Sequence, residues 1–254
     1  MMKTKSENRR ALPKFLVGIL IAAIFGGVLG FCAGMVNGGN LAENARTALN
    51  TALTAAGPWG IPVTSVIFLG IGWGLYRQAR GLYKSWDGED EDSIDTAEQK
   101  LSWALMMSAL AMLADFFFLS VLVIYDVGGL LPTLVHLGLF LVSVAVIVVL
   151  QQKIVDLEKR INPEKQGSVY DFKFQKKWLD SCDESEQRQI GQASYKAYLA
   201  VTHVCLWTWV ALLVIHYAFD TGLLPMVPVL IIFGVMQITY TLESIRLSRK
   251  GGEK

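Results

Sequence analysis

Apolar stretches of about twenty residues recur along this 254-residue chain, separated by shorter polar segments. A helix of that length crosses the roughly 30 Å hydrocarbon core of a bilayer, where a backbone must satisfy its own hydrogen bonds. Charged residues make up only 18% of the chain, against about 25% in ordinary soluble domains. The sequence therefore predicts an all-α, polytopic transmembrane helix bundle.

Six spans are predicted, and together they make residues 1–254 a single membrane domain with the lipid bilayer as its surroundings. The spans lie at about residues 15–36, 58–76, 101–124, 130–150, 198–219 and 223–242. Of the 23 Lys and Arg residues, only Arg46 lies in an outer segment, and the other 22 lie in inner segments. Because basic residues stay on the cytoplasmic side, both termini and the loop 151–197 are predicted to be cytoplasmic.

The start of the chain has a second interpretation, because basic residues before an apolar stretch also mark signal peptides. The stretch is longer than a signal-peptide core, and no Ala-x-Ala cleavage site follows it. Leu29–Cys32 resembles a lipoprotein cleavage box, but the bulky Phe31 before the cysteine argues against cleavage. We therefore interpret this segment as an uncleaved first span.

A stripe of small residues runs along the first span, with one such residue in every fourth position. Its members are Gly18, Ala22, Gly26, Gly30 and Gly34. Stripes of this kind allow two membrane helices to approach closely. We expect this helix-packing seam to contact either the second span, where Gly70 and Gly74 match it, or the same seam on a second copy of the chain.

Three polar side chains inside the predicted spans are candidates for an intramembrane site: Asp115, His136 and His216. A carboxylate at the centre of a span costs at least about 2.5–3.5 kcal/mol on insertion scales, so Asp115 should face protein and be paired or protonated. A short outer turn joins the third and fourth spans, so Asp115 and His136 are predicted to lie near each other. The group is either a proton or cation site or, as we favour, a polar pair that holds helices together.

The polar segments carry no recognisable site for a metal, cofactor or nucleic acid. Seven acids occur between Asp87 and Glu98, but an EF-hand loop does not fit their register, and a solvated charged run is favoured. The three cysteines, Cys32, Cys182 and Cys205, suggest neither a disulfide framework nor a zinc site. No protease, hydrolase or phosphate-loop motif is present, so we do not expect an enzyme.

Local signals divide the polar segments into helices. Residues 37–57 are predicted to form a short outer amphipathic helix that ends at Gly57-Pro58. The fourth span should continue to about Ile161 and stop at Asn162-Pro163. A short helix near 171–180 follows, with Phe174 and Trp178 expected in the inner membrane interface. Asp183 and Glu186 then form a capping box for a helix that runs on into the fifth span.

The stretch from Phe174 to Glu186, with Tyr195-Lys196-Ala197 before the fifth span, resembles an uncharacterised six-span integral-membrane family of Gram-positive bacteria. The family is a domain of unknown function. The resemblance implies a location in a bacterial plasma membrane and an association with small regulators or export systems. It implies no catalytic activity and no cofactor.

Three kinds of function fit these observations. The first is a non-catalytic accessory or regulatory subunit that partners a transporter, an export or immunity complex, or a sensor. The alternative is a small secondary carrier or ion-coupled channel that uses Asp115, and two similar outer turns, 125–132 and 219–225, suggest the duplicated hairpins common in carriers. An intramembrane enzyme is the third and has almost no motif support. A membrane-protein partner or a homo-oligomer fits the first of these.

The basic-residue distribution generates a topology prediction. In a cysteine-free background, cysteines introduced by Ser93→Cys and Ser248→Cys should resist impermeant thiol reagents in intact cells and react after permeabilisation, because both positions are predicted to be cytoplasmic. A cysteine introduced in place of Thr47, in the outer segment, is the matched control and should react in intact cells. Rapid labelling at either of the first two positions would contradict six spans with both ends inside.

Overall fold

The computed structural model describes residues 40–125 and 129–251, with positions 12–14, 16–17, 20–21, 24, 26–28, 31 and 34–35 before them. Half of the first predicted span, 15–36, including the seam residues Gly18, Ala22 and Gly30, therefore lies outside the described residues. The described part has only helical elements: α2 (Asn40–Ser85), α3 (Glu91–Ile124), α4 (Leu130–Ile161), α5 (Phe174–Asp180), α6 (Glu184–Phe219) and α7 (Met226–Gly251). The chain divides into two units, Ala48–Ile190 and the combination of Met1–Thr47 with Gly191–Lys254.

Five of the described helices, α2, α3, α4, α6 and α7, are long and apolar enough to cross a membrane. They coincide with the second to sixth predicted spans, which confirms an all-helical chain of membrane-spanning character. Several helices are longer than the apolar stretch within them. The 32 residues of α4 extend about 48 Å at 1.5 Å per residue, so α4 continues well past a 30 Å hydrocarbon core.

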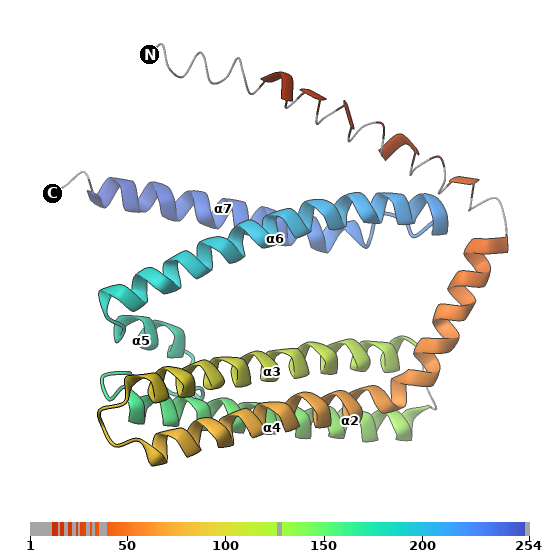
Figure 1. The fold of residues 1–254 in the computed structure, drawn as a ribbon. Helices are drawn as coiled ribbons and strands as arrows, with labels where there is room; N and C mark the ends of the chain where they lie inside the picture. The colour runs from red at the N-terminus through yellow and green to blue at the C-terminus, as the bar shows by residue number, and fades with distance from the viewer. Residues whose placement is uncertain are drawn as a thin grey trace, which may run out of the picture. The chain divides into compact units, whose positions relative to one another are not determined.

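The N-terminal half of α2 differs from the prediction of a separate outer helix ending at Gly57-Pro58. α2 is one continuous helix that contains Pro58 and Pro62, and its ribbon changes direction in its N-terminal half (Figure 1). Pro62 has no N–H to donate to the carbonyl oxygen of Pro58, four residues earlier. The ring nitrogen Nε2 of His136 lies 3.2 Å from that oxygen, where it supplies the missing donor when the imidazole carries a proton on Nε2. The prolines therefore bend α2 without ending it.

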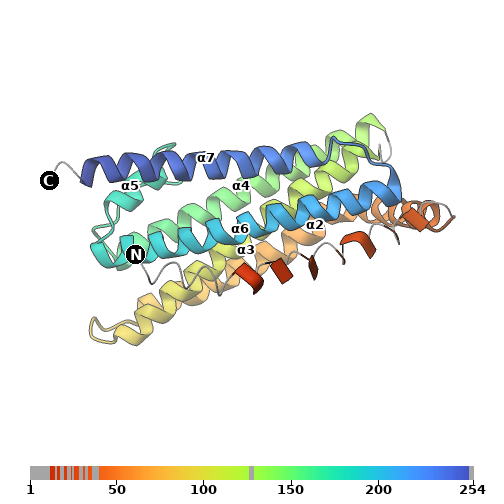
Figure 2. The same ribbon diagram turned by 90° about the horizontal axis from the view of Figure 1, so that it is seen from above.

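In the unit Ala48–Ile190, α2, α3 and α4 form an antiparallel three-helix bundle (Figures 1 and 2). All buried residues of α4 except Val155 follow one another in steps of three and four, the spacing of a coiled coil: Phe140, Ser143, Ile147, Leu150, Ile154, Leu157 and Ile161. The stripe on α3 has the same spacing and includes the small residues Ala97, Ala104, Ser108 and Ala111. A narrow buried stripe leaves the remaining apolar faces exposed, as expected for helices surrounded by lipid.

Glycines on α2 let its backbone approach α3 and α4. A Cβ atom added to Gly60 would lie 2.0 Å from the ring of Phe118, and one added to Gly72 would lie 3.1 Å from Leu150. Gly70 has nothing within 4 Å of its added Cβ, and neither does Gly74. Gly57 also packs against Val121 and Leu122, so the glycines of α2 that pack inside the bundle are Gly57, Gly60 and Gly72, while Gly70 and Gly74 face away from α3 and α4.

The described seam residues of the first predicted span, Gly26 and Gly34, also have open space where a Cβ would stand. They belong to the other unit, Met1–Thr47 with Gly191–Lys254. The packing of the seam against the second span or a second copy therefore stays a prediction.

The segment after α4 confirms the local predictions. α4 ends at Ile161, and Asn162 follows as its C-cap. In the capping box before α6, the Glu186 N–H donates to Asp183 Oδ1 at 2.8 Å, and the Asp183 N–H donates to Glu186 Oε2 at 3.0 Å. The helix that begins there runs without a break to Phe219.

In the second unit, α6 lies beside α7. The Tyr198 hydroxyl donates to Gln237 Oε1 at 2.9 Å, and the ring of Tyr198 stacks on that of Tyr240 with centroids 4.5 Å apart. At the other end of α6, the Gly222 N–H donates to His216 Nδ1 at 3.1 Å. His216 therefore stabilises the turn between the two helices.

Replacing Gly60 with alanine should destabilise the bundle, because the new methyl group must displace the Phe118 ring. Overpacking of this kind costs about 1–3 kcal/mol, and the measurement is the thermal unfolding midpoint of the purified protein in detergent. Gly70→Ala is the matched control, with the same gain in helix propensity and open space at its Cβ. Equal midpoints for the two variants would contradict a close approach of α2 and α3.

Candidate functional site

Asp115 is fully buried between the three helices of the bundle. The Ser65 hydroxyl of α2 donates to Asp115 Oδ1 at 2.9 Å, and the Ser143 hydroxyl of α4 donates to Oδ2 at 2.5 Å. The two serine oxygens are themselves 2.9 Å apart. Each helix thus contributes one oxygen-bearing side chain to a closed ring of three contacts.

The ring of contacts links three helices that are far apart in the sequence. Interhelical hydrogen bonds between polar side chains are one of the interactions through which membrane helices associate. Asp115 therefore joins α2, α3 and α4 through the hydroxyl groups of Ser65 and Ser143.

The predicted contact between Asp115 and His136 is not formed. His136 Nδ1 lies 2.7 Å from the carbonyl oxygen of Pro132, and its Nε2 lies against Pro58. Ser143, which contacts Asp115, is seven residues further along α4, a rise of about 10 Å. His216 lies in the other unit and has partners within its own turn, Gly222 and Asp220, the latter at 4.0 Å. Asp115, His136 and His216 therefore each have local partners of their own.

Two serines and a second polar pair were missed from the sequence. Ser65 and Ser143 were not singled out, and neither was the buried Ser108, which accepts a hydrogen bond of 3.0 Å from Gln151 Nε2. Ser108 lies seven residues before Asp115 on the same stripe of α3. The signal available in the sequence was the heptad register itself, because polar residues on a buried stripe must find partners there.

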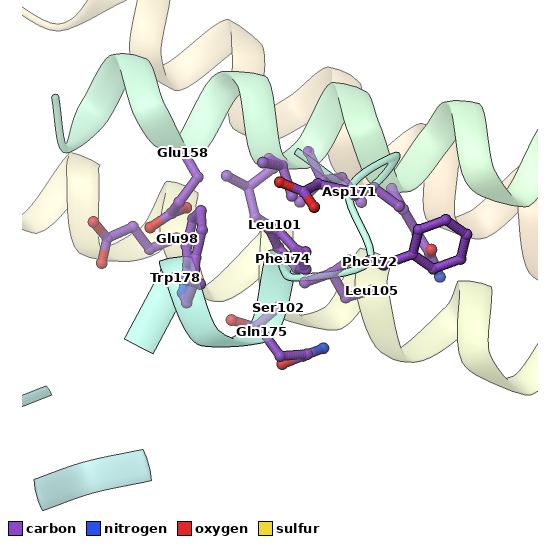
Figure 3. A pocket seen from close by; sticks show the side chains of 14 residues that line it. Glu98, Leu101, Ser102, Leu105, Glu158, Asp171, Phe172, Phe174, Gln175 and Trp178 are labelled. Carbon is purple, nitrogen blue, oxygen red and sulfur yellow. The ribbon is translucent and has the colours of Figure 1, made fainter. Parts of the chain in front are cut away.

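A pocket of about 700 Å³ opens at the other end of α3 and α4, next to α5 (Figure 3). Its polar lining includes Glu98 from α3 and Glu158 from α4, and its apolar lining includes Leu101, Ile154 and Trp178. The side-chain amide of Asn162 contacts both glutamates, at 2.7 Å from Glu98 and 3.2 Å from Glu158. A single amide therefore faces two carboxyl groups.

Burial, together with the negative charge of Glu98, raises the pKa of Glu158 to about 7. Glu158 lies beyond the apolar stretch of α4, in the part of the helix that also carries Lys153, Asp156 and Lys159. Near neutral pH this carboxyl group therefore exchanges a proton readily.

The short helix predicted near 171–180 is present as α5, and the interfacial position of its aromatic residues stays a prediction. Phe174 and Trp178 are half-buried and line the pocket, with ring centroids 5.6 Å apart, whereas Tyr170 and Phe172 are exposed. Phe174 lies against Gly167, whose φ of +129° suits glycine and whose added Cβ would be 2.8 Å from the ring. The sequence alone showed that the two aromatic residues lie one helical turn apart. Which face of α5 lines the pocket depends on the turn at Gly167.

An ion pair between a buried lysine and a partly exposed glutamate fixes the same segment. The Lys165 ammonium group pairs with Glu186 at the start of α6, and it lies 3.6 Å from Cys182 Sγ. Burial disfavours the charged lysine, but the contact with Glu186 outweighs this and raises the pKa of Lys165. The positive charge of Lys165 is thereby engaged with Glu186.

The acidic run starts in the loop before α3 and continues into that helix, which begins at Glu91. Asp87 Oδ1 accepts the backbone N–H groups of Glu89 at 3.0 Å and Asp90 at 3.2 Å, and these bonds lower the pKa of Asp87. Among the described residues, no group of three or more His, Cys, Asp and Glu side chains is placed to hold a metal ion.

Comparison with known families matches residues 9–244 of the chain, nearly its whole length, to a family described as "Protein of unknown function (DUF3169)". The chain belongs to the DUF3169 family. This confirms the resemblance to a family of unknown function. No curated protein and no solved structure matches this DUF3169 protein.

The raised pKa of Glu158 predicts how the stability of this DUF3169 protein depends on pH. The folded state binds the Glu158 proton up to about pH 7 and the unfolded state only to about 4.5, so stability falls as pH rises through this window. In the wild type, the free energy of unfolding should fall by about 2–3 kcal/mol over this window. Glu158→Gln should abolish this fall, and the measurement is the unfolding midpoint between pH 5 and pH 8.5. Asp95→Asn, an exposed acid on α3, is the control and should follow the wild type. If the unfolding midpoint of Glu158→Gln changed with pH as that of the wild type does, the assignment of the raised pKa to Glu158 would be contradicted.

Proposed function

We propose that this DUF3169 protein is a non-catalytic accessory or regulatory subunit of a bacterial plasma membrane complex. In this proposal it has six spans with both termini in the cytoplasm, and it partners a transporter, an export or immunity complex, or a sensor. The proposal assigns no enzymatic activity to it.

The closed contacts of Asp115 are the observation that supports this proposal most directly. A carboxyl group that binds a transported substrate or ion has to be reachable, whereas Asp115 is fully buried and both its oxygens contact serine hydroxyls. Residues on either side along the stripes, including Ile61, Leu122 and Ile147, are buried as well. This is the geometry of a hydrogen bond that holds helices together.

The helices of the second unit offer surface for a membrane partner. On α6, only Cys205 and Ala218 are buried, and large apolar side chains such as Trp207, Ile231 and Val235 on α6 and α7 are exposed. Either lipid or a partner helix covers such faces in a bilayer. An accessory subunit uses part of them for assembly.

A small ion-coupled carrier is the second candidate, and one observation favours it. Asp115, Ser65 and Ser143 bring three side-chain oxygens from three helices together within the membrane-spanning bundle. A carboxylate with hydroxyl groups also suits a proton or a small cation. The bend of α2 at Pro58 and Pro62 is the point at which this bundle could open.

Substitutions of Asp115 distinguish the two candidates. Asp115→Asn places an amide oxygen and an amide N–H group opposite the two hydroxyls, which can each donate or accept, so the accessory proposal predicts an unfolding midpoint and partner recovery close to wild type. Asp115→Leu leaves the Ser65 and Ser143 hydroxyls only each other as partners and should cost about 1–3 kcal/mol. The measurements are thermal unfolding in detergent and affinity purification from native membranes.

For the accessory role, a stoichiometric partner should co-purify with both wild type and Asp115→Asn. Gradient-driven uptake by the purified protein in liposomes, abolished by Asp115→Asn, would contradict this role and establish the carrier.

A further inference from the structure

The pocket between α3, α4 and α5 has the features of a ligand site separate from Asp115. Its volume of about 700 Å³ falls within the range of small-molecule sites. Three parts of the chain surround it: the ends of α3 and α4, the loop at 169–172 and one face of α5. Phe174, Gln175 and Trp178 are the α5 residues that line it.

The acidic side of the pocket has no basic partner among the residues that the structure describes. Glu98 and Glu158 share only the Asn162 amide. The nearby Lys165 pairs with Glu186, and the third acid of the lining, Asp171, pairs with Lys177. The two carboxyl groups on one wall therefore have no ion-pair partner of their own, and the charge of Lys165, which pairs with Glu186, acts on Glu158 only from a distance.

Aromatic and aliphatic side chains make up much of the remaining wall, together with polar residues such as Ser102 and Gln151. Trp178 lines the same pocket as Glu158 (Figure 3), and the ring of Phe174 packs against that of Trp178. Leu101, Ile154 and Val155 line the same space. An aromatic face attracts an organic cation within about 6 Å of the ring, and quaternary ammonium groups are recognised in this way.

We propose that this pocket binds a small organic cation, an ammonium group with apolar substituents, through Glu98, Glu158 and the Trp178 ring. A divalent metal ion fits the pocket poorly, since such ions take six or more oxygen ligands and no group of three or more acidic, histidine or cysteine side chains in the described part of the chain is placed to hold one. The ammonium group is either that of a free amine or the headgroup of an aminolipid, because both present the same chemistry.

Binding of the cation should release a proton to solvent, and this release can be measured. When the ammonium group enters, the Glu158 carboxylic acid releases its proton to solvent and the carboxylate faces the new positive charge. Because the pKa of Glu158 in the empty pocket is about 7, affinity should rise about tenfold between pH 6 and pH 8. The inference is independent of whether the protein acts as an accessory subunit or a carrier.

The test is isothermal titration of the full-length protein in a neutral maltoside detergent with benzyltrimethylammonium, at pH 6 and pH 8. Choline and its uncharged isostere 3,3-dimethylbutanol separate the contribution of charge from that of shape. We expect the cations to bind, the alcohol to bind at least tenfold more weakly than choline, and affinity to be higher at pH 8.

Three variants assign the binding to this pocket. Glu158→Gln should weaken cation binding at least tenfold at pH 8 and abolish its pH dependence, and Trp178→Leu should weaken it while leaving an apolar lining. Asp95→Asn removes a similar charge from an exposed position on α3 and should bind as wild type. Unfolding midpoints of all variants show that the fold is retained.

Short-chain lipids below their micelle concentration identify the source of the ammonium group. Competition by dihexanoyl phosphatidylethanolamine, but not by the phosphatidylglycerol, indicates a lipid headgroup, and competition by neither indicates a free amine. Absence of cation binding by wild type, equal binding of choline and its uncharged isostere, or unchanged binding in Glu158→Gln would overturn the proposal.

Discussion

Close approach of α2, α3 and α4 is the constraint on which the rest of this structure depends. Lipid chains are as apolar as leucine, so membrane helices associate through van der Waals contact and interhelical hydrogen bonds. Gly60 and Gly72 provide the contact on α2, where an added Cβ would meet Phe118 or Leu150. Small residues on α3 allow the same approach, and Asp115 with two serines supplies hydrogen bonds that join all three helices.

The same packing explains why the proline-containing helix persists. Pro62 leaves the carbonyl oxygen of Pro58 without its usual donor, and His136 from α4 reaches it. A histidine predicted as part of a polar site thus completes the backbone of a neighbouring helix. Beyond the membrane, α3 and α4 continue as a pair, and the segment fixed by Lys165 and Glu186 lies against them. The rigid bundle therefore positions the pocket that holds Glu98 and Glu158.

Most of the fold was predictable because its signals are local. Apolar run length set the spans, Asn162-Pro163 ended α4, and Asp183 with Glu186 capped α6 as expected. Burial of Asp115 was also predictable, since a carboxyl group inside a span has to face protein. Its partners were not, because Ser65 and Ser143 lie 50 and 28 residues away in sequence. Which residues meet depends on how each helix is rotated about its axis.

The sequence by itself determined the helical character, the membrane-spanning lengths and the caps, because each follows from the composition and spacing of neighbouring residues. Tertiary structure decided that α2 passes through two prolines, that Asp115 joins serines rather than His136, and that Phe174 and Trp178 face inward. It also brought Glu98 and Glu158 to one amide. These outcomes depend on how separate helices are rotated about their axes and on their register along one another. A small change in either brings different residues into contact.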